Sequence, residues 1–134
     1  PGDAFATGFS FRYDVIVLDP NKEIKDASLI FNATTAGTGS SDVNETLTTL
    51  SNQFVDELDV IVNQFEETRE DTWLTDGPTY TGLNAFKDFS VFAPGDNDFA
   101  GVSFIRQTFS QVPAPGAAVL AGLAGVVGIR RRRG

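Results

Sequence analysis

The sequence contains no cysteine, no histidine and no methionine among its 134 residues. The absence of cysteine excludes disulfide bonds, so the stability of the fold must come from its apolar core. Without cysteine or histidine there is no thiol nucleophile, no Ser-His-Asp triad and no ordinary zinc site. Glycine-rich phosphate loops and dinucleotide fingerprints are also missing. Only carboxylates remain for catalysis, and we expect a protein that is not an enzyme.

Basic residues are scarce before position 112. All 18 acidic residues lie before it, but only 6 of the 10 basic ones, which leaves residues 1–111 with a net charge of −12. Such a segment is repelled by nucleic-acid phosphates, so we expect no nucleic-acid partner. Its length and its 12 phenylalanines suit one small core. We therefore predict one β-rich domain over 1–111 and a separate segment over 112–134.

The segment 112–134 has the composition of a membrane segment. Residues 117–129 carry no charge, amide or hydroxyl group. As a helix, the 18 residues from Val112 to Ile129 would rise about 27 Å, close to the roughly 30 Å hydrocarbon core of a bilayer. The basic residues that follow are Arg130, Arg131, Arg132 and Arg133. We expect them to anchor the chain at the cytoplasmic interface, which places 1–111 on the far side of the membrane.

A short proline motif precedes the apolar run and consists of Val112, Pro113, Ala114 and Pro115. The motif, the apolar segment and the terminal arginine cluster together resemble the PEP-CTERM sorting signal of bacterial surface proteins, in its Val-Pro-Ala-Pro variant. Ala114 stands where the motif that names the family has glutamate. The resemblance covers 23 of the 134 residues. It implies processing by a membrane-embedded exosortase-like protease, followed by release or attachment at the cell surface. Export also needs a secretion signal, which we expect upstream of Pro1.

Patterns of period two, which are typical of strands, recur along the domain. They predict strands over 9–18 and 27–34. Apolar residues predict two further strands over 86–92 and 99–109, joined as a hairpin by a turn at 94–97.

The segment 44–67 has a different spacing. Its apolar residues recur every three or four positions, at Leu47, Leu50, Phe54, Leu58, Ile61 and Phe65. A helix would place them on one face, although the threonines and valines of the segment favour a strand. We therefore predict an α+β fold: a small, mainly antiparallel β sandwich with one amphipathic helix over 44–67, plus the C-terminal sorting helix. The alternative is an all-β fold.

Three groups of residues are compatible with other functions. Acidic clusters could serve a carboxylate hydrolase, and they are Asp56, Glu57 and Asp59, and Glu66, Glu67 and Glu70. Asp96 and Asp98 offer the oxygen ligands that calcium prefers, although the same residue types form turns. Exposed phenylalanines, Trp73 and Tyr80 could stack on sugars, although aromatic residues pack into cores by default.

The preferred interpretation is an exported, non-enzymatic surface or extracellular-matrix protein without a cofactor. Its expected partners are membrane lipid, which its C-terminal helix contacts, and the exosortase-like protease. The alternative is an adhesion module that binds extracellular polysaccharide or calcium. A carboxylate hydrolase ranks last.

Overall fold

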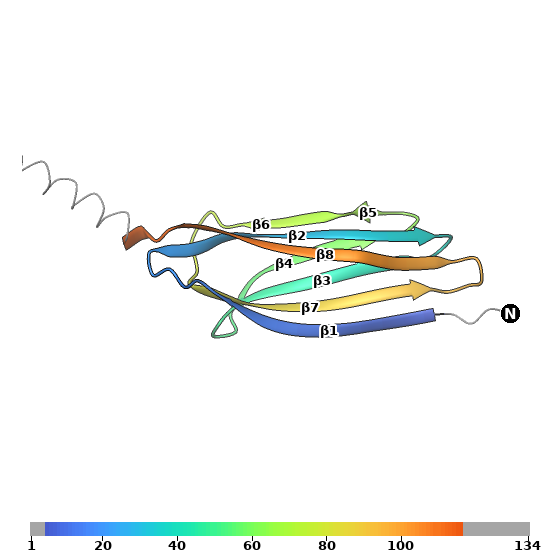
Figure 1. Ribbon diagram of the computed structural model, residues 1–134, viewed down its shortest axis with the longest axis horizontal. Coiled ribbons are helices and arrows are strands. Elements are labelled where there is room, and N and C mark those ends of the chain that lie inside the picture. The colour runs from blue at the N-terminus through green and yellow to red at the C-terminus, as the bar shows by residue number, and fades with distance from the viewer. Residues whose placement is uncertain (1–4, 117–134) are drawn as a thin grey trace, which may run out of the picture.

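The computed structural model describes residues 5–116 (Figure 1). The strands of this part are β1 (Phe5–Ile16), β2 (Lys22–Ala36), β3 (Ser40–Thr49), β4 (Phe54–Val62), β5 (Glu67–Thr68), β6 (Glu70–Leu74), β7 (Gly82–Ala93) and β8 (Phe99–Pro113). They form a five-stranded sheet in the order β1-β7-β3-β4-β5 and a three-stranded sheet in the order β6-β2-β8. All strand pairs are antiparallel. The prediction of a mainly antiparallel β fold is confirmed.

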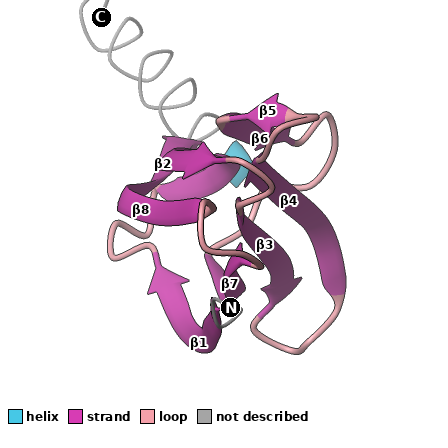
Figure 2. Cartoon of the chain, turned by 90° about the vertical axis from the view of Figure 1, so that its right-hand side faces the viewer, coloured by secondary structure: helices cyan, strands magenta, loops and turns pink. Residues whose placement is uncertain are grey.

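The two sheets face each other and enclose one core, as the view along the strands shows (Figure 2). The smaller sheet contributes Ile24, Ala27, Leu29, Phe31, Ala33 and Trp73 to this core. The larger sheet contributes Val43, Leu47, Leu58, Val60, Val62, Leu83, Ala85, Phe89 and Val91. Within the strands these residues alternate with outward ones, because successive side chains of a strand point to opposite faces. The exception is a register shift in β2 between Ile24 and Asp26, which separates the inward residues Ile24 and Ala27 by three positions. The apolar positions of the period-two patterns in the sequence are therefore the positions that form this core.

The predicted helix over 44–67 is wrong. The segment forms β3 and β4, joined by a turn in which Asn52 takes a positive φ of 66°. Leu50, Phe54 and Phe65, which completed the helical spacing, are exposed. The true pattern has period two, and the β-branched threonines and valines fit a strand better than a helix. Within residues 5–116 only Pro115 and Gly116 have helical geometry, so the all-β alternative describes this part of the chain.

The predicted hairpin of the last two strands is also wrong, although both strands and the turn at 94–97 exist. β7 pairs with β1 and β3, whereas β8 pairs with β2 in the other sheet. The connection between them crosses from one sheet to the other. The register of β8 on β2 runs from Phe99 opposite Ala36 to Pro113 opposite Lys22.

The sandwich has two distinct poles (Figure 1). The loops β2–β3, β4–β5 and β7–β8, together with the Phe5 end of β1, lie at one pole, which we call the loop pole. β8 ends at the opposite pole, where the Ala114 amide donates a hydrogen bond of 2.7 Å to the Asn21 carbonyl. Within residues 5–116, no helix is long and apolar enough to cross a membrane. The predicted 18-residue helix from Val112 to Ile129 is wrong at its start, because Val112 and Pro113 are the last residues of β8. The rest of the predicted sorting helix, in residues 117–134, lies outside the described part.

Candidate functional site

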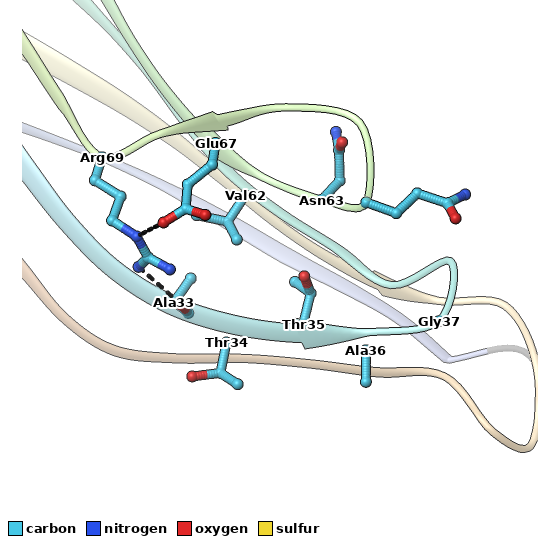
Figure 3. A pocket seen from close by; sticks show the side chains of 10 residues that line it. Ala33, Thr34, Thr35, Ala36, Gly37, Val62, Asn63, Glu67 and Arg69 are labelled. Carbon is cyan, nitrogen blue, oxygen red and sulfur yellow. Dashed lines mark hydrogen bonds and ion pairs between the residues drawn. The ribbon is translucent and has the colours of Figure 1, made fainter.

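A cavity of about 360 Å³ opens at the loop pole between the two sheets (Figure 3). We call it the loop-pole pocket, and its lining residues are Ala33, Thr34, Thr35, Ala36, Gly37, Val62, Asn63, Gln64, Glu67 and Arg69. Ala33 and Thr35 point into it from β2, whereas Thr34 and Ala36 point away. Small-molecule sites measure about 300–1,000 Å³, so this pocket suits a small ligand.

Arg69 closes one side of the pocket. Its Nη1 donates to the Ala33 carbonyl at 2.9 Å and to Asn32 Oδ1 at 3.2 Å. Its Nε forms an ion pair with Glu67. These contacts neutralise the guanidinium and tie the segment between β5 and β6 to β2. The pocket therefore presents hydroxyl and amide groups rather than an unpaired charge, and a neutral, hydroxyl-rich ligand matches it better than an anion.

The predicted calcium ligands lie in the neighbouring β7–β8 loop. Asp98 accepts hydrogen bonds from the Thr38 amide at 2.7 Å and from Thr38 Oγ1 at 2.8 Å. The two hydrogen bonds to Thr38 lower the pKa of Asp98 below its ordinary value. Asp98 thus braces the β2–β3 loop, in which Gly37 adopts a φ of 62°. No cluster of three or more His, Cys, Asp or Glu residues in 5–116 is placed to hold a metal ion.

The acidic residues considered for hydrolysis are distributed over several surfaces. Asp56 and Glu57 are consecutive in β4 and therefore point to opposite faces of the sheet. Glu57 and Asp59 lie on the outward face, where both accept hydrogen bonds from the Asn44 amide nitrogen. A glycosidase needs two carboxylates across a cleft, and Glu67 is the single carboxylate in the lining of the loop-pole pocket.

The outward face of the larger sheet is acidic where β3 and β7 meet. Desolvation raises the pKa of Asp42, and the charges of Asp88 and Asp59 raise it further. Repulsion between these carboxylates acts through solvent and weakens as the salt concentration rises.

The aromatic residues proposed to stack on sugars divide into two groups. Trp73 is buried and its ring lies 5.8 Å from that of Tyr80, so this pair belongs to the packing of the core. Phe9 and Phe11, by contrast, are exposed on β1 and stacked with their ring centroids 5.9 Å apart. The larger sheet has more strands than the smaller one, and its edge strand β1 remains largely uncovered on the core-facing side.

A second polar site, which the sequence analysis missed, lies between the sheets. Glu45 of β3 and Lys87 of β7 stand directly opposite each other on the inward face, with 0% and 3% of their surfaces exposed. Their side chains form an ion pair. Gln107 of β8 reaches them from the facing sheet, and Lys87 Nζ lies 2.5 Å from its Oε1. We call Glu45, Lys87 and Gln107 the core triad.

The surroundings of the core triad are mostly apolar. Leu58 lies beside Glu45 in the β3–β4 register, and Leu29 lies beside Gln107 in the β2–β8 register. The Tyr13 ring lies 5.8 Å from Lys87 Nζ, and burial raises the pKa of Tyr13 to about 12. Burial lowers the pKa of Lys87 to about 8. Desolvation therefore favours the neutral amine, whereas the Glu45 carboxylate favours the ammonium form.

The predicted sorting motif, Val112 to Pro115, begins within β8 and continues directly beyond its end. Val112 and Pro113 are the last residues of this strand, opposite Glu23 and Lys22. Ala114 and Pro115 follow β8, which ends at the pole opposite the loop-pole pocket (Figure 1). The four arginines at 130–133 lie outside the described residues. Comparison of the chain with protein-family models, with curated proteins and with solved structures finds no match.

Proposed function

We propose that the chain is a non-enzymatic, exported surface or extracellular-matrix protein that an exosortase-like protease sorts through its C-terminal tail. The tail supplies the proline motif, the apolar run and the arginine cluster. The β sandwich is the exported body. The net charge of −12 over residues 1–111 favours an aqueous location away from anionic headgroups.

One observation supports this proposal beyond the tail itself. The strand that leads into the sorting motif ends at the pole opposite the loop-pole pocket (Figure 1). A chain tethered through its tail would therefore hold the pocket and the surrounding loops away from the membrane. This orientation is the one that a surface protein needs in order to present a binding face.

The arginine cluster provides the first test. Replacing Arg130–Arg133 by glutamine should lower the membrane-bound fraction severalfold, because each basic residue near an anionic leaflet contributes about 1 kcal/mol and together they fix the orientation. The measurement is fractionation of the full-length chain in a bacterium that has an exosortase. Mass spectrometry of the product shows in addition whether the chain ends near Pro115 or at Gly134.

Replacement of the same four residues by lysine is the matched control. It keeps the charge and should preserve both membrane association and processing. Unchanged sorting of the glutamine variant would contradict the proposal.

A second candidate function is the binding of a saccharide at the loop-pole pocket. The pocket favours it because its lining offers the Thr35 hydroxyl beside an Arg69 guanidinium that Glu67 neutralises. The alternative ligand of an adhesion module is calcium, bound through Asp96 and Asp98.

Calorimetric titration of the chain with bacterial extracellular polysaccharide and with calcium separates these ligands. Thr35→Val should weaken saccharide binding about three- to tenfold, because it removes one hydrogen bond of about 0.5–1.5 kcal/mol. Thr34→Val is the matched control, since this side chain points away from the cavity (Figure 3). Equal losses in the two variants, or no heat with either ligand, would reject a binding role for the pocket.

A further inference from the structure

The core triad brings three reactive groups together inside the sandwich. An amine, a carboxamide and a carboxylate meet there, one from each of β7, β8 and β3. Ion pairing alone would not need the carboxamide. Gln107 Nε2 is buried and has no hydrogen-bond partner, and the same holds for Glu45 Oε1. Unpartnered polar atoms beside a buried ion pair are costly, and each requires an explanation.

We propose that Lys87 and Gln107 join spontaneously through an intramolecular isopeptide bond, with Glu45 as the proton carrier. The bond would be an amide between Lys87 Nζ and Gln107 Cδ, and it would connect the larger sheet to the smaller one. The bond lies within the β sandwich and does not depend on sorting through the tail.

The reaction balances without any co-reactant. Glu45 takes a proton from the Lys87 ammonium, and the neutral amine then attacks Gln107 Cδ. The attacking nitrogen then loses a second proton, again to Glu45. Glu45 passes both protons to Nε2, and the bond from Cδ to Nε2 breaks as ammonium leaves, so the chain loses the mass of one ammonia. Glu45 ends as the carboxylate that it was at the start, and nothing is oxidised or reduced.

The surroundings favour each step. Apolar packing disfavours separated charges, so transfer of the proton from Lys87 to Glu45 yields a neutral amine and a neutral acid. The lowered pKa of Lys87, about 8, has the same effect. Groups held at contact distance react with effective concentrations of about 10⁵–10⁸ M, which compensates for the low reactivity of an amide.

The roles within the triad follow from its composition. Glu45 is the buried carboxylate at this site, and it touches the Lys87 amine. If Glu45 itself were the electrophile, no second acid would remain to move the protons. Gln107 Oε1 faces Lys87 Nζ at 2.5 Å, which places the carboxamide against the nucleophile. The assignment of Gln107 as the electrophile leaves Glu45 free to carry protons.

Mass spectrometry of the folded chain tests the bond directly. We expect a mass lower by one ammonia than the sequence requires. Trypsin normally cuts after Arg69, Lys87 and Arg106. An acylated Lys87 resists cleavage, so the digest should contain peptide 70–106 joined to the peptide that begins at Gln107.

Two variants complete the test. Glu45→Gln keeps the size of the side chain but cannot carry protons, so it should show the full sequence mass and normal cleavage at Lys87. Lys22→Ala, at an exposed lysine, should still lose ammonia. Circular dichroism verifies that each variant is folded.

The chain without substitutions provides the decisive measurement. The full sequence mass in the folded protein, with separate peptides 70–87 and 88–106, would overturn the proposal. Loss of water instead of ammonia would place the bond at Glu45 and overturn the assignment of Gln107. Ammonia loss that remains in Glu45→Gln would remove Glu45 from the reaction.

Discussion

Lys87→Ala is expected to lower the free energy of unfolding by at least about 3–5 kcal/mol, the usual cost of removing one partner of a buried ion pair. Glu45 would remain fully buried, beside apolar residues such as its β4 register partner Leu58. Urea unfolding followed by tryptophan fluorescence measures the change, since Trp73 is part of the core. A loss below about 1 kcal/mol would show that the carboxylate of the variant regains water.

The double variant Glu45→Leu/Lys87→Met separates the charge from the bond. Apolar replacements for a buried ion pair are often neutral or stabilising. This variant should therefore regain the free energy of unfolding that Lys87→Ala loses by leaving Glu45 unpaired. It cannot form the cross-link, which spans 20 residues between Lys87 and Gln107. Closing a loop of that size contributes about 3 kcal/mol. If the double variant is as stable as the chain without substitutions, this result would contradict the cross-link.

Phe31→Ala is expected to cost about 3–5 kcal/mol, because it opens a cavity in the centre of the smaller sheet. Phe31 is 1% exposed, lies opposite Ile105 of β8 and packs in the core. Phe65 is the matched control, since it is 88% exposed in the β4–β5 connection. Phe65→Ala should change the stability by no more than about 0.5 kcal/mol. Similar losses in the two variants would contradict the assignment of the core.

The strands that alternate cleanly could be predicted from the sequence. Phe9, Phe11 and Tyr13 lie on one face of β1, and Leu29 and Phe31 lie on the inward face of β2, as their spacing indicates. Side-chain alternation alone determines these elements. It does not determine strand partners, and for this reason β7 and β8 resembled a hairpin although they belong to different sheets.

The error over 44–67 and the missed core triad have the same cause. The inward face of β3 reads Val43, Glu45, Leu47, and a glutamate in the middle hides the apolar alternation. Lys87 does the same in β7, between Ala85 and Phe89. An acidic residue at an inward position of one strand and a basic residue at an inward position of another are a usable signal of a buried ion pair. The sequence alone could not show that the two strands are neighbours.

The opposite positions of the Phe5 end of β1 and the Pro113 end of β8 have a mechanical consequence (Figure 1). A pull applied at these two points acts along the strands rather than across them. The ladders that join β1 to β7 and β8 to β2 would then be sheared, so many hydrogen bonds would have to break together instead of one after another. For a chain tethered as proposed, flow or cell-to-cell traction would load the sandwich along its strands, the direction in which the hydrogen-bond ladders resist most strongly.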